Sequence, residues 1–154
     1  ALTRDRPWHV RFIELMPLGV GEPAALSRAR FVPSAETEAH IVAALGPLTP
    51  LAASDPSAES RNVRLIGGQG TIGFISPVSR PYCGTCNRMR LTADGKFHLC
   101  LLNDDELNVR DALAVGGVSA VQQVLLRAVG AKPTGHRLHA NETIKRREMF
   151  QLGG

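Results

Sequence analysis

The stretch PYCGTCNRMRLTADGKFHLC, residues 81–100, contains all three cysteines of the 154-residue chain. Their spacing is Cys83-x2-Cys86-x13-Cys100. In a CxxC loop the chain can fold back so that both sulfurs reach one centre. Asp94-Gly95 is a strong signal for a two-residue hairpin turn, and a hairpin here would return Cys100 toward the CxxC pair. The stretch therefore predicts a hairpin that carries a metal site built on three thiolates.

The identity of the metal stays open at this point. A structural zinc site needs four ligands, and His98, on the same strand face as Cys100, could complete a Cys3His set. The arrangement is not that of a typical zinc ribbon, which would offer a second CxxC. A [4Fe–4S] cluster can be held by three thiolates, which leaves one iron open. The pattern favours an iron–sulfur cluster, with zinc or no metal as alternatives. The odd, clustered cysteines favour a reducing compartment, the cytoplasm or an organelle matrix.

Two arginines lie beside the cysteines and suggest an anionic ligand. Arg88 and Arg90 are two residues apart on a predicted strand, so both side chains can point to one side. Guanidinium groups bind phosphate in a bidentate manner, although the two could also merely neutralise thiolates. Residues 61–154 carry 13 basic and 7 acidic side chains, whereas residues 1–60 carry 5 and 7. This basic half is typical of proteins that bind nucleotides, phosphate or nucleic acid.

Hydrophobic periodicity and turn signals predict the elements around this site. We expect one hairpin over 62–79, with its turn at the glycines 67–70, and a second over 89–102. Helices are expected over 33–47, capped by Ser34, over 104–117, starting at Asp104 or Asp105, and over 119–130. The two hairpins would form one antiparallel sheet with two helices against it. No apolar run approaches the roughly 20 residues that a membrane span needs.

Residues 9–19, HVRFIELMPLG, read as a strand that leaves a core. Arg11 and Glu14 interrupt its apolar run, and a buried charge is costly unless it is paired. An edge strand that exposes both side chains to water is the simplest interpretation.

Taken together, these motifs resemble those of the GTP 3′,8-cyclase family of radical S-adenosylmethionine enzymes, which begin molybdenum-cofactor biosynthesis. The segment GTIGFISPVSRPYCGTCNRMRLTADGKFHLCLL resembles the C-terminal cluster motif of the family, and VRFIELMPLG, AKPTGH and the terminal GG match at suitable positions. The resemblance covers essentially the whole chain but only the C-terminal part of such an enzyme. It implies an α/β fold, in which the end of a partial barrel is followed by a small α+β domain. The expected domains are 1–48, a linker at 49–60, and 61–154 as the cluster and GTP-binding domain.

The resemblance also implies roles for individual residues. Cys83, Cys86 and Cys100 would hold a [4Fe–4S] cluster whose open iron binds the guanine of GTP. GTP would also contact Arg88, Met89, Arg90 and a buried Arg11, the arginines mainly through the phosphates. Met16 would lie where the family contacts S-adenosylmethionine. Gly153 and Gly154 would thread into the active site, where only a residue without a side chain fits. His98 would be an ordinary strand residue.

The chain departs from the family in one respect. Radical chemistry there needs a second cluster on an N-terminal CxxxCxxC motif, which this sequence lacks. The absence of an initiator Met also suggests a cut into a longer protein. We therefore expect a missing N-terminal radical S-adenosylmethionine domain as partner, and no activity from the chain alone. Together with that N-terminal domain, the chain would convert GTP to (8S)-3′,8-cyclo-7,8-dihydroguanosine 5′-triphosphate. A downstream cyclic pyranopterin phosphate synthase would consume this product.

Two other classes of function remain possible from the residues alone. A zinc-stapled module that binds nucleic acid would suit the basic half, but such modules interleave stacking aromatics, and here aromatics are only 5% of residues. A metal-stapled interaction domain without a ligand is the third class. The resemblance favours the function as the cluster-binding and GTP-binding part of an enzyme, with GTP as ligand and neither nucleic acid nor membrane as partner. Without its barrel the chain should expose apolar surface along 9–19 and self-associate, for example as a homodimer.

Overall fold

The computed structural model describes residues 2–18, 21–53, 55–138, 147 and 149–152. Contacts divide the chain into two units. The first comprises Ala1–Met16 and Arg28–Cys86, and the second comprises Pro17–Ser27 and Asn87–Gly154. Gly153 and Gly154, the glycines expected in the active site, lie outside the described residues.

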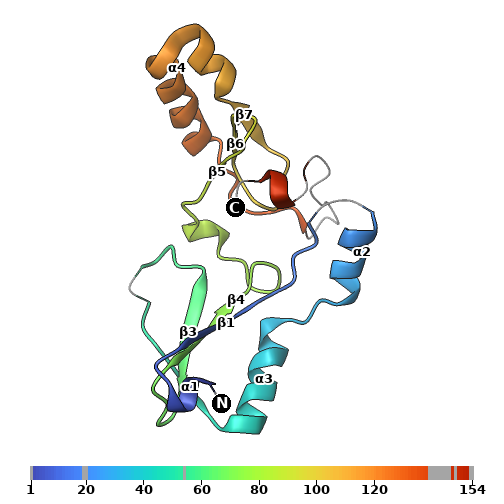
Figure 1. Cartoon of the computed structure of the whole chain (residues 1–154), viewed down its shortest axis with the longest axis vertical. Helices are drawn as coiled ribbons and strands as arrows, with labels where there is room; N and C mark the ends of the chain where they lie inside the picture. Colours follow the sequence, from blue (N-terminus) through green and yellow to red (C-terminus); the bar gives the residue numbers. More distant parts are fainter. Residues whose placement is uncertain (1, 19–20, 54, 139–146, 148, 153–154) are drawn as a thin grey trace. The chain divides into compact units, whose positions relative to one another are not determined.

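The first unit is built on an open four-stranded sheet with the order β1-β4-β3-β2. Figure 1 labels β1, β3 and β4 of this sheet. The strands are β1 (His9–Ile13), β2 (Leu48–Pro50), β3 (Ser60–Leu65) and β4 (Thr71–Ile75). Only β1 and β4 run parallel, while β2–β3 and β3–β4 are antiparallel. The predicted hairpin over 62–79 is confirmed, because β3 and β4 are joined by a turn in which Gly67 has a φ of 74°.

One face of this sheet carries the core of the first unit. Val63, Leu65, Ile72 and Phe74 are buried and alternate along β3 and β4 as a half-buried sheet requires. They pack against Ile41 and Leu45 of α3 (Ser34–Leu45) and against Leu48. Helix α1 (Leu2–Asp5) also belongs to the first unit, whereas most of α2 (Glu22–Ala29) belongs to the second.

Helix α3 lies within the predicted range 33–47 and ends at Gly46, which has a φ of 95°. The predicted cap is wrong, because the N-cap residue is Pro33 and Ser34 is the first residue of the helix. The backbone N–H of Ser34 instead donates to Glu14 Oε1 at 2.9 Å, and the Ser34 hydroxyl accepts a bond from Ser76. A carboxylate from another element therefore satisfies the positive end of the helix.

The second unit contains a separate antiparallel sheet with the order β5-β6-β7. Its strands are β5 (Arg90–Leu91), β6 (Lys96–His98) and β7 (Glu106–Asn108). The predicted Asp94-Gly95 turn is confirmed: Gly95 has a φ of 81° and its N–H donates to the Thr92 carbonyl at 2.9 Å. The expectation of one sheet from both hairpins is wrong. The second hairpin takes its third strand from β7, which pairs with β6, and among the described residues it shares no strand pairing with the first sheet.

Helix α4 (Arg110–Gly130) covers the two helices predicted over 104–117 and 119–130. The predicted boundary survives as a break, because Gly117 has φ 60° and ψ −152° inside the element, where the helix changes direction (Figure 1). The expected start at Asp104 or Asp105 is wrong, since residues 106–108 pair with β6. Asn108 caps the helix instead: its Oδ1 accepts the Asp111 N–H at 3.0 Å.

Taken together as α4, the two predicted helices bear on the expectation that no segment is long and apolar enough to span a membrane. The 21 residues of α4 contain a window with a mean hydropathy of 1.5, and by length and composition alone α4 could cross a membrane. A single helix of this kind is weak support for a span, and the break at Gly117 interrupts its backbone. The C-terminal segment contains a short 3₁₀ helix, η3 (Met149–Gln151).

Candidate cluster and nucleotide site

Cys83 and Cys86 lie in one tight turn of the first unit. A 3₁₀ helix, η1 (Cys83–Thr85), begins at the first cysteine, and the Cys86 N–H donates to the Cys83 carbonyl at 3.2 Å. Side chains at positions i and i+3 of a 3₁₀ turn eclipse each other, so both thiols leave the turn on one side. Each is partly exposed. This geometry suits two ligands of one metal centre.

Cys100 belongs to the second unit, where it follows β6 at the start of a turn whose Asn103 N–H donates to the Cys100 carbonyl at 3.2 Å. All three cysteines, each within the described residues, are thiols and none forms a disulfide. In the described parts of the chain, no group of three or more His, Cys, Asp or Glu residues is placed to hold a metal ion. The donor set itself fits an iron–sulfur cluster or zinc, since both are bound by soft thiolates. The three-cysteine site stays a prediction.

Lys132 holds together the two segments of the second unit that carry predicted site residues. Its Nζ donates to the carbonyl of Arg88 at 2.7 Å and to that of Leu99 at 3.0 Å. The arginine segment is thereby tied to the residue that precedes Cys100. Sequence reasoning gave Lys132 no role, although it lies in the AKPTGH segment that carried part of the family resemblance. Met89 and Arg90 follow directly, and both are partly buried.

Arg11 lies on the face of the first sheet that is opposite to the core. A Cβ at Gly73 would meet Ser60 Oγ, Asn62 Oδ1 and Arg11 Cγ at 2.4, 2.9 and 3.2 Å, so these groups gather over that glycine. The described strands β1–β4 carry three arginines and no acidic residue. Arg11 is exposed on an edge strand, whereas the family resemblance implied a buried arginine. Arg11 and Arg64 lie on this face, whereas Arg61 lies on the core face, over the Phe74 ring and paired with Glu38.

Glu14, at the end of β1, behaves differently from the edge-strand expectation. It is only 4% exposed, and it accepts hydrogen bonds from three backbone N–H groups, those of Ser34, Val78 and Ser79, at 2.9, 3.0 and 2.9 Å. The Ser79 hydroxyl donates a further bond. Burial alone would raise the pKa of Glu14, but these bonds to its charged form, led by those from Ser79, lower it. Glu14 therefore shapes the loop that leads from β4 to the CxxC turn.

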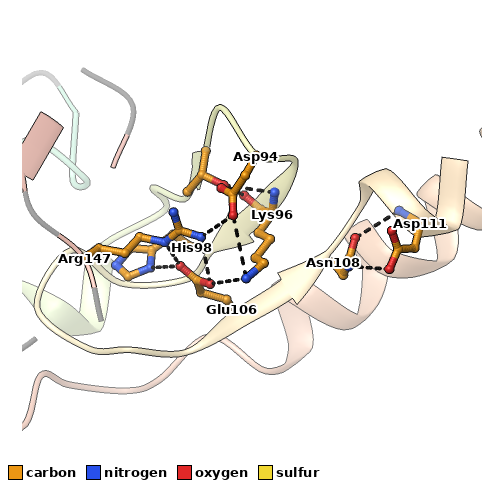
Figure 2. Close-up of polar contacts among 8 residues, drawn as sticks. Asp94, Lys96, His98, Glu106, Asn108, Asp111 and Arg147 are labelled. Atoms are coloured by element: carbon orange, nitrogen blue, oxygen red, sulfur yellow. Dashed lines mark hydrogen bonds and ion pairs between the residues drawn. The ribbon is translucent and has the colours of Figure 1, made fainter. Parts of the chain in front are cut away.

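A cluster of charged side chains covers one face of the second sheet (Figure 2). The carboxylate of Glu106 contacts the Arg147 guanidinium, Lys96 Nζ at 3.3 Å and His98 Nδ1 at 3.4 Å. Asp94 accepts a second bond from Arg147 at 2.9 Å. The bonds from Arg147 lower the pKa of both carboxyl groups, and Glu106 in turn raises the pKa of Arg147. His98, only 1% exposed, is the most buried member of this cluster, whereas the side chains of Asp94 and Lys96 are 45% and 37% exposed.

The first unit also contains Met16 and a hollow beside the CxxC turn. Met16, the residue expected near S-adenosylmethionine, is partly buried. A hollow of ≈ 320 Å³ opens beside the CxxC turn and is lined by Asn62, Phe74, Arg80 and Tyr82 among others. Arg80 is exposed there and was missed by sequence reasoning, because no motif singled it out.

Both thiol segments, the arginine segment and Lys132 lie within residues 8–138, which match the family model described as Molybdenum Cofactor Synthesis C. The chain belongs to this family. It is 42% identical to a GTP 3′,8-cyclase of Moorella thermoacetica, 39% to one of Pelotomaculum thermopropionicum and 37% to one of Petrotoga mobilis. Each comparison covers 99% of this chain and 46% of the relative. The chain thus spans about half the length of the curated relatives it matches, and it is shown to resemble their C-terminal part.

Proposed function

We propose that the chain is the cluster-binding and GTP-binding part of a GTP 3′,8-cyclase. Cys83, Cys86 and Cys100 hold a [4Fe–4S] cluster, and the substrate is GTP. The observation that carries the proposal is the concentration of three thiols and two arginines within residues 83–100 of a chain that aligns over 99% of its length with enzymes of that name.

The arginine segment positions the triphosphate in this proposal. Arg88 and Arg90 supply guanidinium forks, and Met89 lies between them against the ligand. Lys132, through its bonds to the carbonyls of Arg88 and Leu99, keeps this segment in register with Cys100. Arg11 adds charge from a sheet face that carries no carboxylate on its strands. Such preorganised positive groups bind and orient a polyphosphate without reorganisation.

The cluster supplies one kind of chemistry when it is bound: its iron without a protein ligand is a Lewis acid that can take a guanine donor atom. The three thiols fit this role because three, not four, protein ligands leave that position open. Met16 contacts S-adenosylmethionine, and Gly153 and Gly154 enter the active site. An N-terminal radical S-adenosylmethionine domain, in which β1 continues a partial barrel, completes the enzyme. The chain alone has no cyclase activity, and a downstream synthase consumes the product.

The first test is anaerobic reconstitution of the chain with iron and sulfide, followed by metal analysis and a visible spectrum with and without GTP. We expect about four irons per chain, a brown chromophore and a spectral change on adding GTP but not ATP. Cys83→Ser should abolish all three. Arg90→Ala should keep the iron but weaken GTP binding about tenfold, the effect of losing one charge-assisted contact. Arg127→Ala, an exposed arginine on α4, is the matched control and should bind GTP normally.

A different result would support the alternative function. One tightly bound zinc, no colour and no response to GTP would favour a zinc-stapled module, in which His98 is the fourth ligand. His98→Ala distinguishes the two sites, because it should remove zinc from such a module and leave the iron content of a three-thiolate cluster unchanged.

A further inference from the structure

His98 on β6 is buried, and one of its two ring nitrogens lies beside a carboxylate. Its Nδ1 is 3.4 Å from Glu106 Oε1 on β7 (Figure 2), which is long for a full hydrogen bond. The hydrogen bonds from Arg147 and Lys96 lower the pKa of Glu106, so this carboxyl group is ionised at neutral pH. Because a carboxylate can only accept a hydrogen bond, the proton between the two groups belongs to Nδ1.

The proton on Nδ1 determines what the second ring nitrogen can do. In an uncharged imidazole one nitrogen is a donor and the other is an acceptor, so Nε2 of His98 is the acceptor. Among the residues that the structure describes, Nε2 is buried and has no hydrogen-bond partner. A buried polar atom without a partner costs free energy, and such atoms are rare in folded proteins. His98 is therefore a buried acceptor that requires a donor.

The strand register places a side chain with several donors directly opposite His98. Arg90 on β5 is the cross-strand partner of His98, and His98 is the partner of Glu106. Directly opposed residues share a face of the sheet with their Cβ atoms roughly 4.5–5.5 Å apart, so the three side chains form one row. Arg90 is half-buried, and its guanidinium carries five N–H donors and no acceptor. The long side chain of Arg90 can reach Nε2 across one strand spacing.

The other cations beside Glu106 already have acceptors. Arg147 directs its Nε at Glu106 and its Nη2 at both Glu106 and Asp94, and Lys96 Nζ lies 3.3 Å from Glu106. None of these contacts reaches Nε2 of His98. Among the cations described on this sheet, Arg90 is therefore the best placed to donate to Nε2.

We propose that His98 is a positioning residue for Arg90: its Nδ1 donates to Glu106, and the Arg90 guanidinium turns to donate an N–H to its Nε2. This bond uses one of the five donors and fixes the plane of the guanidinium, so the remaining donors are oriented for a phosphate. The inference rests on the proposed function, in which Arg90 binds GTP. The competing explanation is that His98 only fills the interior of the second unit.

The affinity of the whole cluster-loaded chain for GTP, measured by spectral titration, separates the two explanations. His98→Leu keeps an apolar side chain in the buried position but removes the acceptor. We expect this variant to keep its iron and to bind GTP about fivefold more weakly, the effect of losing one hydrogen bond. Combined with Arg90→Ala, it should bind no more weakly than Arg90→Ala alone, because His98 acts through Arg90. Affinity equal to that of the parent chain, or multiplied losses in the combination, would overturn the proposal.

Two matched substitutions test the part that Glu106 takes. Glu106→Gln and Asp94→Asn each remove one negative charge from the same cluster, but only Glu106 contacts His98 among the described residues. An amide can donate as well as accept, so Glu106→Gln no longer holds the proton on Nδ1. This variant should bind GTP on the order of twofold more weakly, whereas Asp94→Asn should match the parent chain. Equal affinities of the two variants would overturn the role of Glu106.

Nuclear magnetic resonance of the full chain before reconstitution tests the contact without GTP. Long-range proton–nitrogen correlations should place the His98 proton on Nδ1, a measurement that needs no variant. The guanidinium signal of Arg90, identified by its loss in Arg90→Ala, should shift in His98→Leu and stay in place in Arg127→Ala. A proton on Nε2, or an Arg90 signal that does not shift in His98→Leu, would overturn the contact. If both results are as expected but the loaded parent chain does not bind GTP, the proposed function fails and the contact between His98 and Arg90 stands.

Discussion

At the scale of single residues, Glu14 does the most to organise the first unit. One carboxylate binds the N-terminus of α3, through the Ser34 N–H, and the loop after β4, through Val78 and Ser79. That loop continues into the CxxC turn. A buried carboxylate that accepts several N–H bonds is stable as an anion, and removing it leaves buried donors without partners. Glu14 therefore links the fold of the first sheet to the position of Cys83 and Cys86.

We predict that Glu14→Gln lowers the free energy of unfolding of the first unit by about 2 kcal/mol at neutral pH. The amide keeps the shape of the side chain but places an N–H group where only acceptors fit. Because the pKa of Glu14 in the folded chain lies below its ordinary value of 4.5, its contribution is present above that value and is lost as the pH falls through the folded pKa. The difference between parent and variant should therefore shrink in acid.

Urea unfolding followed by circular dichroism, at neutral pH and below the ordinary carboxyl value, measures this difference. Glu36→Gln is the control, because Glu36 is exposed in the first turn of the same helix and should cost about 0.5 kcal/mol or less. Equal effects of the two substitutions, or a Glu14→Gln effect that does not change with pH, would contradict the role assigned to Glu14.

At the scale of elements, Gly70 sets how closely the N-terminal segment approaches the first hairpin. The Gly70 N–H donates to the Thr3 carbonyl at 2.9 Å, and the Thr71 N–H donates to the Trp8 carbonyl at 2.9 Å. A Cβ on Gly70 would lie 2.2 Å from the Trp8 carbonyl oxygen and 2.7 Å from that of Arg6. These are backbone atoms, which cannot move aside as a side chain could.

We predict that Gly70→Ala destabilises the first unit by more than about 2 kcal/mol, since the chain must separate α1 and the start of β1 from the hairpin. Gly84→Ala is the matched control: a Cβ at Gly84, in the CxxC turn, meets nothing within 4 Å. Thermal unfolding of both variants checks the prediction. A Gly70→Ala chain as stable as Gly84→Ala would show that the close approach is not required.

The elements also show which parts of the fold can be read from local sequence. Both hairpins were predictable because their turns need glycine at positive φ, as at Gly67 and Gly95. The break at Gly117 was predictable for the same reason. The partner of each strand was not, because the parallel pairing of β1 with β4 joins residues about sixty positions apart and depends on the whole sheet. Likewise Glu14 looked like an exposed charge, since its donors come from distant loops.

The residues of the candidate site also fall into those that the local sequence predicts and those that it does not. The cysteines and arginines could be found from spacing and residue type, because thiolate and guanidinium chemistry is local information. Lys132, Arg147 and the burial of His98 could not, because each depends on a contact across more than one element. No periodicity in the sequence marks a lysine that binds two carbonyl groups 44 and 33 residues away.

At the scale of the whole molecule, two apolar surfaces stand out among the described residues. One surrounds β1, where Trp8, Ile13 and Leu15 are 51%, 60% and 45% exposed. Strand β1 is also an edge strand, so no strand of the described part of the chain lies beside its outer backbone groups. The other surface lies on α4, where Val115 and Val118 are 92% and 80% exposed. Large apolar patches and unprotected strand edges promote association.

We predict that the chain alone self-associates through the surface around β1, because this surface combines apolar side chains with an unpaired edge, whereas α4 satisfies its own backbone. Sedimentation velocity over a range of concentrations should show a shift toward dimers or larger species. Ile13→Lys, which places a charge on the edge strand, should return the chain to a monomer, as charged residues do on natural sheet edges. Val115→Lys should leave association unchanged. The opposite pattern would assign association to α4, and a parent chain that stays monomeric at every concentration would show that neither surface drives it. If β1 is responsible, adding a separately produced N-terminal radical S-adenosylmethionine domain should compete with self-association, since the proposed barrel uses the same edge.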